Sequence, residues 1–193
     1  MYRILGPKGG VIVRSTTLAR AKKILPALRR RFGKIRLVNL APPLTRRQRI
    51  VRWARWGVDH TAEIHYTETP ARSEWLRVRP FDRLPLTTDC SGFATLCYRL
   101  AGARDPNGLN YVTLGYTGTL LDHANRSGQI LTDVSKAKRG DLIVYGPGTG
   151  EHVAIVVEPG PDPLTVSHGD EQGPEYIKVS QDGRRPQRVC RYR

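Results

Sequence analysis

The first 58 residues contain no aspartate or glutamate. They hold sixteen lysines and arginines, whereas residues 59–193 hold sixteen basic and seventeen acidic side chains. The formal net charge of +15 is therefore concentrated in the first third of the chain. Arginine-rich helices are often only solvated surfaces, but so long a stretch without acids favours a polyanionic partner. No basic and aromatic RNA-binding motif and no DNA-reading helix pattern is present, which argues against nucleic acid as that partner.

Cysteine is scarce, with only Cys90, Cys97 and Cys190 among 193 residues. An odd number of cysteines without framework spacing argues against a disulfide scaffold. No closely spaced CxxC or HxxxH pair is present, so a zinc site is disfavoured and no metal or other cofactor is expected. The sequence therefore predicts reduced thiols and chemistry that needs side chains alone.

Long apolar runs are also missing. No stretch reaches the length of a membrane span, and the first residues carry no apolar run of the secretion-signal type. We therefore expect synthesis in the cytoplasm without a signal peptide. At 193 residues the chain can bury one full core and a small appendage. The expected oligomeric state is a monomer.

The segment Asp89-Cys90-Ser91-Gly92-Phe93 stands where a proline-rich stretch gives way to an apolar pattern with helical spacing. Thr88 or Asp89 can cap the predicted helix, which runs to about residue 101. Cys90 then falls in the first turn, where free N–H groups and the helix dipole favour a thiolate. Cys90 is accordingly a candidate nucleophile.

Two histidines lie on a predicted β-hairpin. Residues 151–158 and 164–168 are the expected strands, and residues 159–163 form the turn. Folding the hairpin about residue 160 places His152 opposite His168, on one apolar face that a helix would cover. A register slip of one residue would separate the two rings.

Structural roles must be weighed beside the catalytic ones. Cys97 lies two helical turns after Cys90 and is expected in the core, as is Cys190 in a terminal strand. Asp170 competes with His168 for the role of orienting a base. The remaining histidines are expected to be surface or packing residues: His60, His65 and His123.

Four segments in order resemble the motifs of the NlpC family. They are Asp89-Cys90-Ser91-Gly92-Phe93, then residues 139–145, then residues 151–155, and finally Val166-Ser167-His168-Gly169. Members are papain-like cysteine peptidases that cut the peptide stems of bacterial peptidoglycan. The resemblance covers about residues 44–193 and implies an α+β fold, with the cysteine helix packed against an antiparallel sheet. A weaker likeness is to wall-degrading lysins of phages that infect actinobacteria.

The resemblance implies a role for each site residue. Cys90 would attack, His152 would act as general base and acid, and His168 would orient His152. Asp89 and Ser91 would contribute to the oxyanion and substrate site, where backbone N–H groups also act. Tyr66 is the best match to a tyrosine that lines the site in the family, although a long insertion separates it from Cys90.

The expected activity is therefore cleavage of an amide bond in peptidoglycan. Alternatives are cleavage of the muramoyl amide, acyl transfer on the same fold, or a nucleic-acid-binding or virion scaffold with an inert peptidase domain. The expected partners are peptidoglycan and anionic wall polymers, with anionic lipid or nucleic acid as second choices. A lysin would leave the host cytoplasm through a separate pore, and a virion-borne enzyme would open the wall at infection.

Residues 1–43 are predicted to form a small basic β-α-β module, and residues 44–193 the peptidase domain. The module has strands near 10–14 and 34–40 and a helix over 17–32, in which Pro26 predicts a kink or a break. Residues 41–43 are the expected joint. Thr45 and Gln48 match a capping box that opens a long helix. A short helix near 117–126 and a sheet from about 141 to the end complete the prediction.

Overall fold

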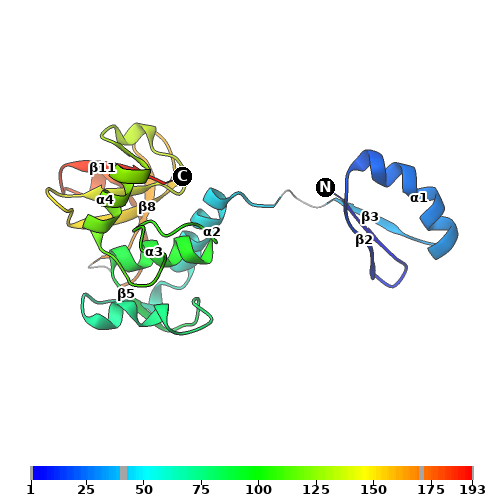
Figure 1. Cartoon of the computed structure of the whole chain (residues 1–193), viewed down its shortest axis with the longest axis horizontal. Coiled ribbons are helices and arrows are strands. Elements are labelled where there is room, and N and C mark those ends of the chain that lie inside the picture. Colours follow the sequence, from blue (N-terminus) through cyan, green and yellow to red (C-terminus); the bar gives the residue numbers. More distant parts are fainter. Residues whose placement is uncertain (1, 40–42, 170–171, 193) are drawn as a thin grey trace. The chain divides into compact units, whose positions relative to one another are not determined.

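The computed structural model describes residues 2–39, 43–169 and 172–192. The chain divides into two compact units, Met1–Leu44 and Thr45–Arg193. Figure 1 shows both units, the first in blue and the second in cyan to red. Of the predicted joint, residues 41 and 42 lie outside the described residues. No helix in the described part of the chain has the length and apolar character needed to cross a bilayer.

The first unit is a three-stranded antiparallel sheet with one helix. Its elements are β1 (Tyr2–Leu5), β2 (Val11–Thr16), α1 (Leu18–Phe32) and β3 (Arg36–Asn39). The central strand is β1, which pairs antiparallel with both β2 and β3. The predicted β-α-β unit is thus a β-β-α-β unit. The strand β1 was missed because four residues at the start of the chain are too few for a periodic signal.

Helix α1 begins after Thr17, whose side chain accepts a hydrogen bond from the Arg20 amide. It continues through Pro26, so of the two predicted outcomes the break does not occur and the kink stays a prediction. Proline removes one amide donor from a helix. Packing of the apolar stripe against the sheet offsets that loss, with Ile4, Ala21 and Ile35 fully or almost fully buried.

The second unit is an antiparallel sheet with three helices on one face. The sheet order is β10-β9-β8-β7-β11-β6. Its strands are β6 (Gln129–Leu131), β7 (Leu142–Tyr145), β8 (His152–Glu158), β9 (Leu164–Ser167), β10 (Glu175–Lys178) and β11 (Gln187–Arg191). The helices are α2 (Arg46–Asp59), α3 (Cys90–Leu100) and α4 (Thr117–Ser127). Short 3-10 turns span Thr61–Glu63, Pro70–Leu76, Val134–Lys136 and Val179–Gln181. The α+β fold is as expected.

Two apolar layers cover the two faces of this sheet. Side chains of α2, α3 and α4 pack on Val153, Ile155 and Val166 in the larger core. Ala154 and Val156 point the other way and pack with Tyr145 in a smaller core. This alternation follows from the two-residue period of a strand, and it decides which residues of β8 and β9 face the helix that carries Cys90.

The start of α2 carries the predicted capping box, formed by Thr45 and Gln48. In the same first turn, Arg47 reaches the fully buried Asp141, which also binds Arg191. The distances are 2.5 Å from Arg47 Nη1 to Asp141 Oδ1 and 2.8 Å from Arg191 Nη2 to Asp141 Oδ2. A buried carboxylate needs such partners, so Asp141 ties α2 and β11 to the start of β7.

Candidate active site

Cys90 is the first residue of α3, as the sequence predicts. Asp89 is the N-cap, and its Oδ1 accepts a hydrogen bond of 2.6 Å from the Gly92 amide. Glycine is required at position 92 because a Cβ there would lie 2.1 Å from Thr88 Oγ1. The motif therefore builds a tight strand-to-helix corner that fixes the backbone of Cys90.

The Cys90 thiol is held by the backbone and is almost fully buried, with 8% of its surface exposed. The backbone amides of Val153 and Ser91 hydrogen-bond the thiol, which lowers its pKa, as does the charge of Arg184. Burial is the larger effect and, with the charge of Asp89, raises the pKa to about 12. The expectation of an easily formed thiolate thus does not hold in this environment.

The hairpin register differs from the prediction by one residue. Ile155 pairs with Val166 and Val156 with Thr165, with an irregularity before Glu158. Continuing this register towards the start of β8 places His168 opposite Val153. The prediction that His152 and His168 are directly opposed on one face is therefore wrong. A bulge in β8 between Val156 and Glu158 accommodates the extra residue, and a slip of one residue moves a side chain to the other face.

His152 is buried at the first position of β8, next to the residue whose amide reaches Cys90. Its Nε2 lies 2.8 Å from Ser167 Oγ, and its ring centroid lies 5.8 Å from that of Tyr145. Ser167 was not singled out from the sequence, although it belongs to the quoted motif. In the tautomer in which Nε2–H donates to Ser167, Nδ1 carries a lone pair that can accept a proton.

His168 is on the side of the sheet that α3 covers. Its ring makes edge contacts with Phe93 and Tyr66, with centroid distances of 5.6 Å and 5.4 Å. Phe93 is one helical turn after Cys90. The structure thus brings His168 to the first turn of the cysteine helix, by ring packing that the sequence did not predict.

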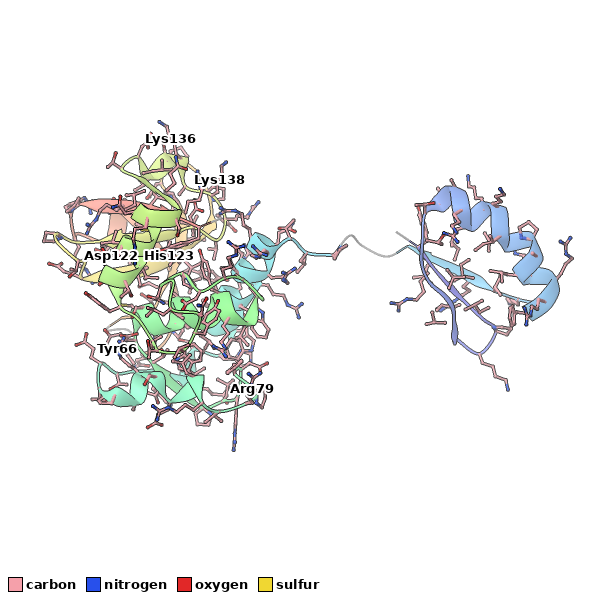
Figure 2. The ribbon with its side chains drawn as sticks, viewed as in Figure 1. Tyr66, Arg79, Asp122, His123, Lys136 and Lys138 are labelled. Atoms are coloured by element: carbon pink, nitrogen blue, oxygen red, sulfur yellow. The ribbon has the colours of Figure 1, made fainter. Side chains whose placement is uncertain are left out.

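Tyr66 reaches the same place across the insertion. It ends β4 (Ile64–Tyr66), which pairs parallel with β5 (Leu86–Thr88), and Tyr66 itself is opposite Thr88. Residues 67–85 are inserted between these two paired strands, and Figure 2 labels Tyr66 in the second unit. Burial raises the Tyr66 pKa, and a hydrogen bond to Glu68 and the charges of Cys90 and Asp89 add to this effect. The phenol is therefore neutral at ordinary pH.

Asp89 and Ser91 were expected to contact substrate, but their side chains are occupied within the protein. Ser91 Oγ donates to Asp89 Oδ1 at 3.0 Å, and Arg72 of the insertion binds both side chains. A second nitrogen of Arg72 donates to the Gly115 carbonyl at 2.9 Å. This network joins the insertion to the start of α3. Arg72 carried no sequence signal, because only the fold brings it to Asp89.

The other singled-out residues have structural surroundings. Cys97 and Cys190 are free thiols buried in the larger core. His60 packs on Trp56, and His123, labelled on α4 in Figure 2, stacks on Tyr192, whereas His65 is exposed. Asp170 lies outside the described residues. Among the described residues no group of three or more histidine, cysteine, aspartate or glutamate side chains is placed to hold a metal ion.

These features define a class of protein: a cysteine at a helix N-terminus, against an antiparallel sheet that carries histidines on two neighbouring strands. The NlpC/P60 family model matches residues 74–188, more than half of the chain. The chain therefore belongs to the NlpC/P60 family. No curated protein matches the sequence.

Solved structures of NlpC/P60 domains resemble the chain at low identity. The P60 domain of an antigen of Mycobacterium avium subspecies paratuberculosis is 19% identical, with a TM-score of 0.48, covering 76% of this chain and 97% of that one. The peptidoglycan hydrolase RipB of Mycobacterium tuberculosis is 20% identical, with a TM-score of 0.44 and coverages of 90% and 85%. RipD of the same organism, described as a non-catalytic NlpC/p60 domain protein adapted to peptidoglycan binding, is 21% identical, with a TM-score of 0.42 and coverages of 74% and 97%.

Proposed function

We propose that the chain is a peptidoglycan hydrolase that cuts an amide bond of the stem peptide, with Cys90 as nucleophile. One observation carries the proposal: in a chain of the NlpC/P60 family, the Cys90 thiol stands at the start of α3 and is hydrogen-bonded by the amides of Ser91 and Val153. In this proposal the same N–H groups stabilise the oxyanion that forms when the sulfur attacks a carbonyl carbon. Removing one such donor typically costs a hydrolase about 3–4 kcal/mol of transition-state stabilisation.

The reaction begins with transfer of the Cys90 proton to an imidazole. The sulfur bonds to the amide carbon, the tetrahedral intermediate collapses, and the imidazolium gives its proton to the leaving amine. Water then hydrolyses the thioester by the same route and frees the cysteine. Because the pKa of Cys90 is raised to about 12, the resting thiol is neutral and loses its proton only as it attacks.

We assign the base to His152. The period of β8 places its side chain with Ala154 and Val156, on the face of the sheet away from α3, so the assignment requires its ring to turn around the end of the strand to reach Cys90. In the tautomer in which Nε2–H donates to Ser167 Oγ, Nδ1 is the nitrogen that would accept the proton. His168 is the second candidate, favoured by its packing on Phe93 beside Cys90. If His152 is the base, His168 and Tyr66 line the site. Ser167 then takes or shares the role of orienting the His152 ring, which the sequence analysis gave to His168.

We further propose that the basic segment 1–43 binds anionic wall polymers and does no chemistry. Eleven of its residues are lysine or arginine, and none is acidic. Attraction between such a segment and a polyanion acts at long range and is weakened by salt. Anionic lipid and nucleic acid are the competing partners, and their binding would show in the same titrations.

The burial of Cys90 favours a second, non-catalytic function. The Cys90 thiol is buried and its pKa is raised, as suits a thiol that packs and does not react. The chain would then bind peptidoglycan without cutting it, which is what the description of RipD says of that protein. Cleavage of the muramoyl amide and acyl transfer are narrower alternatives that keep Cys90 as nucleophile.

The biological setting is part of the proposal. The same chemistry would serve a lysin that is made in a host cytoplasm and released through a separate pore. It would also serve a virion-borne enzyme that opens the wall at infection.

The first test is the loss of turbidity of a bacterial wall suspension, with wild type and with Cys90→Ala. Hydrolysis predicts clearing by wild type alone. Equal behaviour of the two proteins, with binding to the walls retained, would establish the non-catalytic function.

A further inference from the structure

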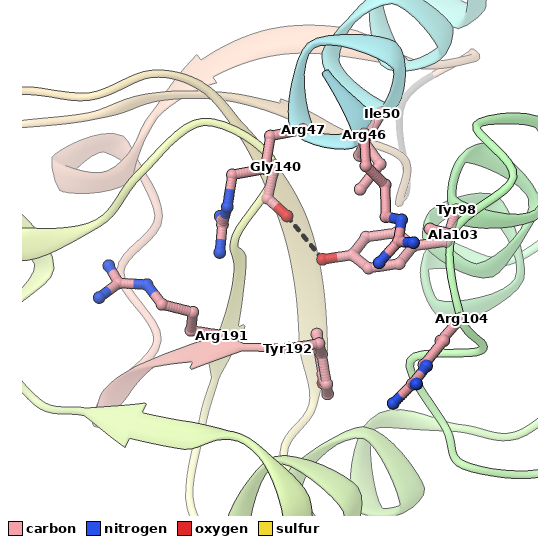
Figure 3. Close-up of a pocket in the computed structure, with 9 residues that line it drawn as sticks. All are labelled: Arg46, Arg47, Ile50, Tyr98, Ala103, Arg104, Gly140, Arg191 and Tyr192. Carbon is pink, nitrogen blue, oxygen red and sulfur yellow. Dashed lines mark hydrogen bonds between the residues drawn. The ribbon is translucent and has the colours of Figure 1, made fainter.

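A cavity of about 300 Å³ lies at the end of α3 remote from Cys90. Figure 3 shows the cavity and the nine residues that line it. They come from the start of α2, the end of α3 and the chain that follows it, the turn before β7, and the end of β11. Four of them are arginines: Arg46, Arg47, Arg104 and Arg191. A volume of this size is at the lower end of the range for small-molecule sites.

Two of the four arginines are already paired. Arg47 and Arg191 share the buried carboxylate of Asp141. Among the described residues, Arg46 and Arg104 have neither an ion-pair partner nor a hydrogen-bond partner for their side chains, and both are exposed. In Figure 3 the guanidinium groups of Arg46 and Arg104 extend along the side of the cavity opposite Arg47 and Arg191. Among the described residues that line it, the cavity therefore has an excess of positive charge, since Arg46 and Arg104 have no acidic partner.

The inner wall of the cavity is aromatic. Tyr98 and Tyr192 meet edge to face with centroids 5.8 Å apart. Their hydroxyls are used inside the protein, where Tyr98 donates to the Gly140 carbonyl at 2.5 Å and Tyr192 to the Leu120 carbonyl at 3.0 Å. Burial raises the pKa of both phenols, so both are neutral. Tyr98 is only 3% exposed, so the carbon surface offered to a ligand comes mainly from the half-buried Tyr192, and the charge comes from the arginines at the rim.

The cavity is distinct from the proposed hydrolase site. Tyr98 is eight residues after Cys90 on α3, which at 1.5 Å per residue separates the two by about 12 Å along the helix axis. Cys90 is at one end, and Tyr98 lines the cavity at the other. A ligand of the cavity would consequently not contact the Cys90 sulfur.

We propose that this cavity binds a small anion with a planar apolar body. Its oxyanion head, a phosphate or a carboxylate, pairs with Arg46 and Arg104, because guanidinium groups bind both anions through paired hydrogen bonds. The apolar body lies against Tyr98 and Tyr192. Asp141 is fully buried and already paired with two arginines, so it does not compete for Arg46 and Arg104.

Binding of phenyl phosphate and of benzoate to the full-length protein tests the proposal, measured by calorimetry at low ionic strength with inorganic phosphate as a third ligand. The variant Arg46→Gln/Arg104→Gln removes both unpaired charges. Arg52→Gln/Arg77→Gln is the matched control, because both arginines are exposed, lie outside the cavity and, among the described residues, have no ion-pair partner. Ala103→Trp fills the cavity without changing its charge. Circular dichroism establishes that each variant is folded.

Saturable binding of either aromatic anion, weakened at least about tenfold by the first variant and by Ala103→Trp but unchanged in the control, supports the site. Whether phenyl phosphate or benzoate binds more tightly identifies the head group. Inorganic phosphate should bind more weakly than phenyl phosphate, because it lacks the ring. Absence of saturable binding, or equal weakening in the control, overturns the proposal, since attraction would then come from the general positive charge. Wall hydrolysis by these variants is a separate readout that the proposal does not require to change.

Discussion

Ser167 Oγ lies 2.8 Å from Nε2 of His152, across neighbouring strands of the sheet. The contact holds the His152 ring, and in the tautomer in which Nε2–H donates to Ser167 Oγ, Nδ1 is the nitrogen that would accept a proton. It also separates the roles of the two histidines, because His168 packs on the aromatic rings of Tyr66 and Phe93.

His152→Ala should abolish hydrolysis as completely as Cys90→Ala, because a nucleophile and its base act as one unit whose losses do not add. Ser167→Ala should lower kcat by roughly tenfold, since the ring loses its orientation but keeps its basic nitrogen. His168→Ala should also be milder than His152→Ala. Rates on a soluble stem peptide measure all four variants. A greater loss in His168→Ala than in His152→Ala would move the base to His168.

The raised pKa of Cys90 predicts how its alkylation depends on pH. Below a pKa of about 12 the thiolate fraction increases tenfold with each pH unit. In His152→Ala, the rate of iodoacetamide reaction at Cys90 should therefore rise from pH 7 to pH 10 without a plateau. Peptide mapping separates this thiol from the buried Cys97 and Cys190. A plateau near pH 8 would show that burial does not control this thiol.

Cys97→Ala should leave hydrolysis largely intact and lower stability. The side chain is 1% exposed in the core beneath α3, so its removal leaves a small cavity. The expected loss is about 1–2 kcal/mol in the free energy of unfolding, read from urea denaturation of the two proteins. An inactive but stably folded Cys97→Ala protein would contradict the assignment of Cys90 as the only reacting thiol.

Removing residues 1–43 should spare the chemistry and weaken attack on walls. The cut leaves Thr45, which caps α2, and removes eleven of the sixteen basic residues that precede Asp59. The truncated protein should cleave a small stem peptide normally and act more slowly on intact walls at low ionic strength. The difference should shrink as salt rises, because exposed charges are screened over about 8 Å at physiological salt.

Two results of this experiment would count against that role. Loss of cleavage of the small peptide would make the segment part of the catalytic fold. A difference on walls that salt does not alter would mean that the contact is not electrostatic.

The sequence predicted those parts of the fold that rest on local signals. The capping box at Thr45, the N-cap at Asp89 and the apolar period of α3 are each contained within a few residues, and each is present. The hairpin strands were also found, but their register was not. Register depends on a bulge before Glu158, which no pattern within either strand reveals.

The contacts that the sequence did not reveal are those between distant segments. Arg72 meets Asp89 only because β4 and β5 pair in parallel and return the insertion to the site. Tyr66 reaches His168 by the same pairing. Ser167 looked like an ordinary strand residue until the fold placed its hydroxyl beside His152. The sequence also did not predict the thiol pKa, because helix position favours a thiolate whereas burial opposes it more strongly.

The most direct test of the account is digestion of purified peptidoglycan, followed by mass spectrometry of the soluble products. Wild type should release fragments with a new amine and a new carboxylate at one stem-peptide bond, each cleavage adding one water, and Cys90→Ala should release none. Fragments broken at the muramoyl amide would keep the nucleophile and change the bond. Intact peptidoglycan after incubation with folded wild-type protein that still binds the wall would contradict the account, and the domain would then be a peptidoglycan-binding module.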